Sequence, residues 1–109
     1  MSTVITADLN NDNRADQVEV TNATTITVSL QQSDGSYVVS AVLTTPKNRP
    51  VGTIVNVVDL DSDGDLDINT AGGLSSGSWY VHKWLNNGDG TFGSIRTELF
   101  RFPKHHGFF

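Results

Sequence analysis

The sequence predicts an all-β protein made of two similar four-stranded antiparallel units. β-branched residues recur in short alternating runs, Asp-Gly pairs separate several of these runs, and a pair of motifs occurs twice within the 109 residues. Alternation with a period of two is typical of strands, and Asp-Gly supplies the positive φ that tight hairpin turns require. Because no long stretch shows helical periodicity, we expect only strands and turns.

Each unit is expected to contain four strands in chain order. In the first unit, TVITADL and DQVEVT lie on either side of an acidic loop, TITVSLQ follows, and SYVVSAVLTT comes after the turn SDG. In the second unit, TIVNVVDL leads into another acidic loop, and SWYVHKWL, NGDG and TFGSIRTELF supply a third strand, a turn and a fourth strand. The predicted boundaries are residues 1–50 for the first unit and 51–109 for the second.

The two units form an internal repeat. The loop DLNNDNRAD at 8–16 matches DLDSDGDLD at 59–67 with a spacing of 51 residues, and LQQSDGSY at 30–37 matches LNNGDGTF at 85–92 with a spacing of 55. A period of about 50 residues with four antiparallel strands is typical of a β-propeller blade. A small β-sandwich of eight strands is the alternative that the strand pattern leaves open.

Charge and composition exclude several classes of protein. The net charge is -5, and eight of the twelve acidic residues lie in the two acidic loops. No basic stripe indicates binding to nucleic acid. No apolar run reaches the roughly 20 residues that span a bilayer, and the start MSTVITADLNN lacks the basic and apolar regions of a secretion signal. Cysteine is absent, which excludes disulfides and thiolate metal sites.

The two motifs together resemble the FG-GAP or VCBS repeat. In that repeat the pattern Asp-x-Asp/Asn-x-Asp-Gly/Asn-x-x-Asp joins the first two strands of a blade, and a segment similar to LNNGDGTF forms the turn between the third and fourth. Such repeats build the seven-bladed propellers of integrin α subunits and of several lectins and secreted bacterial proteins. The resemblance covers nearly the whole chain, and it implies a calcium ion in each acidic loop and an extracellular location.

The chemistry of the loops supports calcium independently of the resemblance. Ca²⁺ takes six to eight oxygen ligands, which alternate residues of a tight loop can supply. The sixth loop position requires a positive φ, which glycine adopts freely and asparagine tolerates; Gly64 and Asn13 hold it. The expected ligands of the first site are Asp8, Asn10, Asp12 and Asp16 with the backbone carbonyl of Arg14, and those of the second are Asp59, Asp61, Asp63 and Asp67 with the carbonyl of Asp65.

The two expected calcium sites differ in strength. The first has three carboxylates where the second has four, and Asn13 replaces glycine, so we expect the first to bind more weakly. An EF-hand would need flanking helices and a glutamate at position twelve, but the second loop has Thr70 there, and Glu19 of the first lies within an alternating strand. A solvated acidic turn without metal is the remaining alternative for each loop.

Two blades do not close a ring, because propellers usually have four to eight and each blade needs both faces covered. The segment PKHHGFF at 103–109 aligns with PKNRPVG at 46–52, so the end of one chain leads in register into the start of another. We therefore expect a cyclic homo-oligomer: a six-bladed trimer first, as in small two-blade lectins of other families, and an eight-bladed tetramer next. A piece of a longer propeller or an engineered fragment is the alternative.

The function expected from the sequence is a calcium-stabilised binding module, lectin-like or protein-binding. Its partners would be a glycan or an extracellular protein, besides other copies of the chain. Aromatic rings suit the stacking of sugars, but aromatic residues on strands are more often packing residues between blades. Strand alternation also places the first member of the candidate cluster on the opposite face from the others. The cluster consists of Trp79, Tyr80, His82 and Trp84.

Two other functions are kept as alternatives. One is a purely structural, self-assembling propeller fragment or designed scaffold without a ligand. The other is an enzyme acting on polysaccharides, but the aspartates are assigned to metal, and Gly-x-Ser-x-Gly, phosphate-loop and His-Glu-x-x-His motifs are absent. We therefore expect a protein that is not an enzyme.

Overall fold

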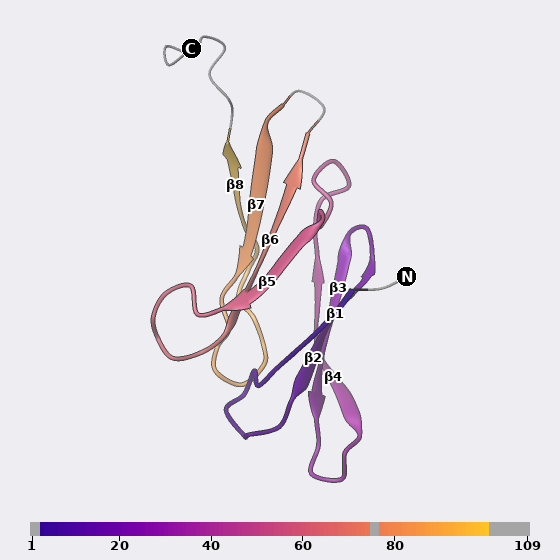
Figure 1. Ribbon diagram of the computed structural model, residues 1–109, viewed down its shortest axis with the longest axis vertical. Helices are drawn as coiled ribbons and strands as arrows, with labels where there is room; N and C mark the ends of the chain where they lie inside the picture. The colour runs from indigo at the N-terminus through magenta and orange to yellow at the C-terminus, as the bar shows by residue number, and fades with distance from the viewer. Residues whose placement is uncertain (1–2, 75–76, 101–109) are drawn as a thin grey trace.

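The computed structural model describes residues 3–74 and 77–100 and contains only strands, turns and loops within these ranges (Figure 1). The predicted continuation at 103–109 lies outside the described residues. Two four-stranded sheets follow chain order with antiparallel neighbours, which confirms the predicted fold class of each unit. The first sheet consists of β1 (Thr3–Ala7), β2 (Asp16–Asn22), β3 (Thr25–Gln31) and β4 (Tyr37–Thr44), and the second of β5 (Ile54–Val58), β6 (Asp67–Gly73), β7 (Trp79–Trp84) and β8 (Arg96–Phe100).

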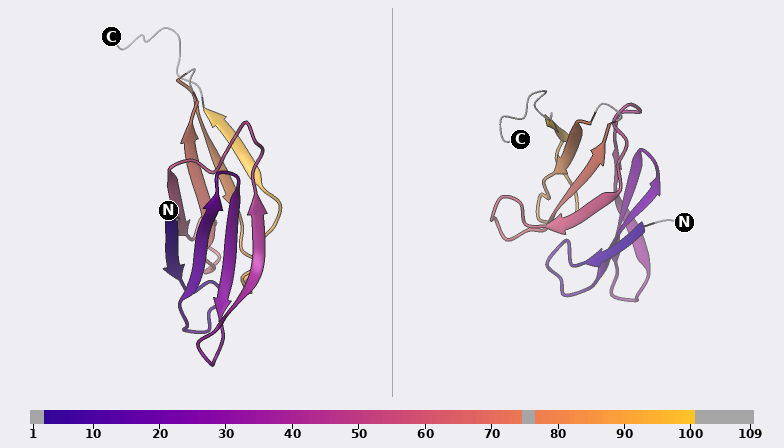
Figure 2. Two further views of the ribbon diagram at one scale, coloured as in Figure 1. Left: turned by 90° about the vertical axis from the view of Figure 1, so that its right-hand side faces the viewer. Right: turned by 45° about the horizontal axis from the view of Figure 1, so that its top comes forward.

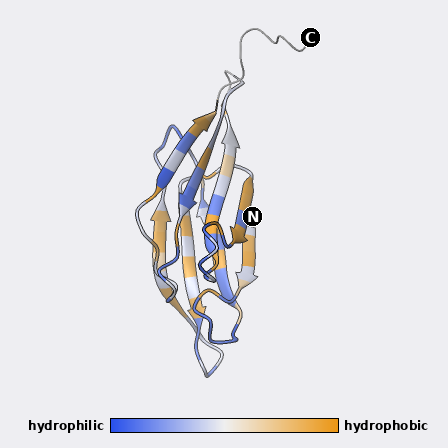
Figure 3. Cartoon of the chain, turned by 90° about the vertical axis from the view of Figure 1, so that its left-hand side faces the viewer, coloured by the Kyte–Doolittle hydropathy of each residue, from blue (hydrophilic) through white to orange (hydrophobic). Residues whose placement is uncertain are grey.

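The two sheets pack face to face around one apolar core. Figure 1 shows the first sheet, in indigo to purple, beside the second, in pink to yellow, and both views of Figure 2 agree with this layering. Apolar and polar residues alternate along the strands (Figure 3), and the buried apolar residues give each sheet an inward-facing apolar side. The core draws on both sheets and on the segments between strands: Leu9, Val18, Ile26, Val28, Leu43, Val51, Ile68 and Trp84.

Unlike faces of the two repeats meet at this core. Val18 of β2 is buried there, whereas its counterpart at the repeat spacing of 51 residues, Asn69, lies on the opposite face of β6 from the buried Ile68. The front of one repeat therefore covers the back of the next. Successive propeller blades pack in this way, while a two-fold sandwich would pair like faces. The arrangement is consistent with two propeller blades.

One face of each sheet remains open, and both open faces are more polar than the buried ones. Lys83 and Glu98 form an ion pair across β7 and β8 on the open face of the second sheet. Some repeat counterparts of core residues are thus polar where no sheet of this chain covers them, as Gln17 is for Ile68, although Leu60, the counterpart of Leu9, stays apolar. Exposed apolar side chains, among them Val4, Val42 and Ile54, also lie on these faces. The polar residues of the open faces include Thr6, Gln17, Glu19, Thr25, Thr27 and Ser29 in the first sheet and Asn56, Asn69, Lys83, Arg96 and Glu98 in the second.

The turns between third and fourth strands have the predicted Asp-Gly geometry. Asp34 Oδ1 accepts a hydrogen bond from the Ser36 N–H at 2.9 Å, and Asp89 Oδ1 accepts one from the Thr91 N–H at 3.0 Å. Gly90 has a φ of 86°, and a Cβ at this position would lie 2.7 Å from Leu30 Cδ2. Glycine at position 90 therefore permits both the turn and the close approach of the first sheet.

The described residues contain no helix with the length and apolar character that spanning a membrane requires.

Candidate metal centre

Each acidic loop connects the first two strands of its sheet and begins and ends at paired strand residues. Ala7 pairs with Asp16 at the base of the first loop, and Val58 pairs with Asp67 at the base of the second. The antiparallel register therefore brings the two ends of each loop together. Residues 8–15 and 59–66 must curl within a short span, and this directs alternate side chains toward a common centre.

The last aspartate of each loop is buried and fastens the loop to its sheet. In the first loop, Asp16 Oδ2 accepts the Leu9 N–H at 2.8 Å, and Asp16 Oδ1 accepts the Gln31 N–H at the end of β3 at 2.9 Å. One carboxylate thus holds the second loop residue and the third strand in place. Each of its oxygens has a further lone pair that a cation could use.

Asp67 repeats this arrangement in the second loop. Its Oδ2 accepts the Leu60 N–H at 2.9 Å, and its Oδ1 accepts the Asn86 N–H just after β7 at 2.7 Å. Sequence reasoning assigned Asp16 and Asp67 to metal and missed this second role. The signal was present, because the LQQ and LNN segments of the second repeated motif supply the two N–H donors.

The first aspartate of each loop closes the turn from the other side. Asp8 Oδ2 accepts the Asn13 N–H at 2.8 Å, and Asp59 Oδ2 accepts the Gly64 N–H at 2.9 Å. Asn13 and Gly64 have φ values of 65° and 90°, which confirms the positive φ predicted at the sixth loop position. The fourth position also has a positive φ, at Asn11 and Ser62, and sequence reasoning did not find it.

The candidate ligand atoms gather tightly in both loops. In each cluster, one carboxylate oxygen from every member lies within 4.8 Å of those of all the others. Oxygens coordinated to one Ca²⁺ at about 2.3–2.6 Å lie at separations of this size, so the spacing fits the ion. The clusters are Asp8, Asp12 and Asp16 in the first loop and Asp59, Asp61, Asp63 and Asp67 in the second.

Asn10 provides a second observation for the first site. Its side-chain Oδ1 is buried and has no hydrogen-bond partner. A buried acceptor without a donor is rare in proteins and costs free energy, and a bound cation would satisfy it. The residues present therefore fit a calcium ion. The Asp65 side chain accepts a hydrogen bond from Asn11 Nδ2 at 2.9 Å, which agrees with the prediction that only its backbone carbonyl binds the metal. The backbone carbonyls of Arg14 and Asp65 remain predicted ligands.

The electrostatic environments of the two loops differ. The pKa of Asp61 is raised above its ordinary value. The largest cause is desolvation, and the hydrogen bond and negative charge of Asp63 and the charge of Asp67 act in the same direction. In the first loop, partial desolvation acts in the same upward direction on Asp12, but hydrogen bonds and the charge of Arg14 outweigh it and lower the pKa. The Arg14 guanidinium lies 3.0 Å from Asp12 Oδ2. Negative charge is therefore less compensated in the second loop.

The FG-GAP-like repeat family model matches residues 8–70, from the first residue of the first acidic loop into β6. The chain belongs to this family. FG-GAP repeats form β-propeller-type modules for protein interaction and are typically extracellular. Neither the comparison with curated proteins nor the comparison with solved structures gives a match.

The aromatic cluster of this FG-GAP chain is divided between two faces, as alternation predicts. Tyr80, His82 and Trp84 are fully buried between the sheets, so they are packing residues and offer no surface to a ligand. His82 Nε2 lies 2.8 Å from the Arg49 carbonyl, so this ring also holds the segment that connects the sheets. Trp79 alone keeps an exposed surface, 36%, and stacks on Phe100 with ring centroids 5.4 Å apart.

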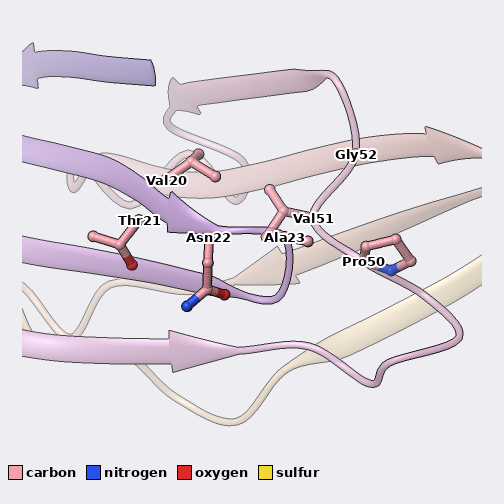
Figure 4. Close-up of a pocket in the computed structure, with 7 residues that line it drawn as sticks. All are labelled: Val20, Thr21, Asn22, Ala23, Pro50, Val51 and Gly52. Carbon is pink, nitrogen blue, oxygen red and sulfur yellow. The ribbon is translucent and has the colours of Figure 1, made fainter. Parts of the chain in front are cut away.

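A hollow of about 410 Å³ lies between the end of β2 and the segment connecting the sheets (Figure 4). Its lining contains no titratable side chain; the hydroxyl of Thr21 and the amide of Asn22 are its polar side-chain groups. None of the predicted ligand or metal-binding residues contributes to it. The lining consists of Val20, Thr21, Asn22, Ala23, Pro50, Val51 and Gly52.

Proposed function

We propose that this FG-GAP protein is a calcium-stabilised β-propeller-type binding module that holds one Ca²⁺ in each acidic loop. The observation that carries the proposal is the convergence of carboxylate oxygens to within 4.8 Å of one another in both loops. The buried, unpartnered Oδ1 of Asn10 adds a neutral oxygen to the first set. Extracellular calcium, abundant where FG-GAP repeats typically occur, would be the source of the ion.

The role proposed for calcium is structural. The carboxylates of one loop lie a few ångströms apart and repel one another, and salt in the solution screens this repulsion only partly. When bound, the ion would supply the positive charge that neutralises the carboxylates. The protein's own contribution is geometric: Asp16 and Asp67 fasten each loop to its third strand, while Asp8 and Asp59 close the turns. A filled loop would therefore fix the first hairpin of its blade.

Isothermal titration calorimetry with CaCl₂ tests this proposal. The wild-type chain should bind two ions, and Asp12→Asn and Asp63→Asn should each abolish binding at one loop. Asp34→Asn is the matched control, because it removes the same charge from a turn outside both clusters and should leave two sites. Absence of calcium binding in the wild type, or two unchanged sites in both loop variants, would contradict the proposal.

The partner proposed for the module is a glycan or an extracellular protein. Trp79 supports this because it presents an exposed ring, stacked on Phe100, on the open face of the second sheet. A glycan array probed with the calcium-loaded chain separates a lectin from the alternative, a structural scaffold without a ligand. Glycan binding that Trp79→Ala removes would support the lectin, whereas an array without binding would favour protein recognition or the scaffold.

We also propose that the module completes its ring with other copies of itself. The trimer is the preferred assembly and the tetramer the next. Front-to-back packing of the two sheets supports ring formation, since the same packing can repeat between chains. Such a ring would cover the open face that carries Trp79, so a chain in a closed ring would have to bind its partner elsewhere. The open faces are more polar than the buried pair, however, so a junction between chains would bury less apolar surface and associate more weakly. Native mass spectrometry with calcium should show trimers; a monomer at every concentration would contradict ring formation.

A further inference from the structure

Asn86 connects the two acidic loops across the junction between the sheets. This residue belongs to the LNNGDGTF motif and is only 4% exposed. Its Nδ2 donates to the Leu9 carbonyl of the first loop at 2.7 Å and to the Leu66 carbonyl of the second loop at 2.9 Å. Its Oδ1 accepts the N–H groups of Gly88 and Gly90 at 2.8 and 3.2 Å, so every polar atom of the amide is occupied.

The hydrogen bonds of Asn86 form part of a continuous chain between candidate metal ligands. Asp16 Oδ2 accepts the Leu9 N–H, and the Leu9 carbonyl accepts Asn86 Nδ2. The backbone N–H of Asn86 then donates to Asp67 Oδ1. Only Leu9 and Asn86 therefore separate a buried carboxylate of the first site from the equivalent carboxylate of the second.

A direct contact between the loops runs beside this chain. Asn11 Nδ2 donates to Asp65 Oδ1 at 2.9 Å, and Asn11 has a φ of 60°. Few residues adopt this backbone conformation readily, and asparagine is one that does. The contact therefore depends on the closed form of the first loop. Asn11 lies between the candidate ligands Asn10 and Asp12 in the first loop. Asp65 lies between Asp63 and Asp67 in the second.

The corresponding position in the first repeat has no such connection within the chain. Gln31 aligns with Asn86, but among the described residues its side chain has only a long contact, 3.5 Å from Nε2 to the Tyr37 hydroxyl. Leu9 is 1% exposed beneath the second sheet, whereas its counterpart Leu60 is 36% exposed. The bridge is thus specific to the junction that these two repeats form with each other.

We propose that the two cation sites are a coupled pair, in which filling either loop strengthens calcium binding at the other through Asn86 and Asn11. This inference rests on the proposed function, because it requires that both loops bind calcium. An ion in the first loop would hold Leu9 and Asn11 in their bonding positions. These residues would in turn hold Asp65 of the second loop and Asn86, which bonds to that loop. By thermodynamic linkage the effect must be equal in both directions. Repulsion between the two ions opposes the coupling, but salt screens it.

Calorimetric calcium titrations at physiological ionic strength test the coupling. Disabling the first loop with Asp12→Asn should weaken calcium binding at the second loop by about fivefold or more, within the usual range of coupling between sites. Disabling the second loop with Asp63→Asn should weaken the first by the same factor. In an Asn11→Ala background, and more completely with Asn86→Ser, each factor should fall toward one.

Asn87→Ala is the matched control, because the contacts of this exposed neighbour of Asn86 with the described part of the chain lie within its own hairpin, at Thr91. Its titration should reproduce the wild-type coupling. Asn11 is exposed and its substitution should leave the protein folded, which keeps the test available if Asn86→Ser unfolds it. Two sites of independent affinity would overturn the coupling and leave the proposed function standing. A chain that binds no calcium would overturn both.

Discussion

The two acidic loops share one backbone design but differ in what compensates their charge. In both, the first aspartate accepts the N–H of the sixth residue, and the last accepts those of the second residue and the third strand. The first loop has a neutral Asn10, an ion pair between Asp12 and Arg14, and the cover of the second sheet. The second loop has four clustered carboxylates, three of them exposed, and no such ion pair among the described residues.

This difference shows that groups of the protein compensate the charge of the first loop more than that of the second. Protein groups already offset part of the charge in the first loop, so an ion has less to contribute there. In the second loop the raised pKa of Asp61 marks charge that the backbone hydrogen bonds of the loop offset only in part. We therefore expect the second loop to bind calcium more tightly and to depend on it more.

Removal of calcium should have the largest effect. A ligand at a hundredfold excess over its dissociation constant stabilises the folded state by about 2.7 kcal/mol per site, so two sites give about 5 kcal/mol. Urea unfolding in millimolar CaCl₂ and in EGTA measures this difference. The chain with Asp63→Asn should lose more of it than the chain with Asp12→Asn, and the reverse order would contradict the contrast between the loops.

Asp67→Ala should destabilise the protein even without metal. The substitution leaves the N–H groups of Leu60 and Asn86 without their acceptor, and each unpaired group near the core costs about 1–3 kcal/mol. We expect a loss on the order of 3 kcal/mol in the free energy of unfolding, measured by urea titration in EGTA. Asp65→Ala, a neighbouring carboxylate outside the cluster, is the control and should cost far less.

Gly64→Ala should cost about 1–2 kcal/mol, because an L-residue is strained at a φ of 90°. A Cβ there would meet no atom within 4 Å, so the cost is conformational and not steric. The reciprocal change Asn13→Gly removes milder strain in the first loop and should be neutral or slightly stabilising. Thermal unfolding of the two variants measures both effects, and equal effects of the same sign would show that the loops do not share the conformation.

Asp61→Asn should have the smallest effect on stability, and in metal-free protein it should stabilise the fold. Because the folded-state pKa of Asp61 is raised, its charge opposes folding above that pKa, and the opposition disappears as the pH falls through it. In metal-free protein the variant should therefore melt slightly higher than wild type at neutral pH, and the two should converge below pH 3.8. In calcium the order should reverse.

Asp59→Asn is the paired comparison for this pH experiment. The Gly64 N–H, the largest influence, holds the pKa of Asp59 below its ordinary value, so its charge favours folding above the unfolded-state value. The metal-free variant should therefore melt lower than wild type at neutral pH. Shifts of the same sign for Asp61→Asn and Asp59→Asn would contradict the assigned environments.

Much of the fold could be predicted from the sequence because it depends on local patterns. Alternation of β-branched residues located the strands, and Asp34-Gly35 and Asp89-Gly90 located two hairpins. Repetition of the two motifs showed that the sheets are equivalent. The clustering of the loop aspartates followed from their spacing, since residues at every second position of a curled loop face the same centre.

Other features could not be predicted because they arise between segments distant in the chain. No local pattern shows that Asn86 reaches the Leu9 carbonyl, 77 residues away, or that His82 bonds to the carbonyl of Arg49. The positive φ of Ser62 is also invisible, because serine rarely adopts it and the loop closure enforces it. Alternation did divide the aromatic residues correctly, but only the packing of the sheets shows which face is buried.

A crystal structure of the chain grown in CaCl₂ would test the central claim most directly. The account predicts two electron-density peaks with calcium–oxygen distances of about 2.3–2.6 Å. One should lie among Asp59, Asp61, Asp63 and Asp67, and a second, of lower or equal occupancy, among Asp8, Asn10, Asp12 and Asp16. Ordered loops that hold only water between these carboxylates at millimolar calcium would contradict it.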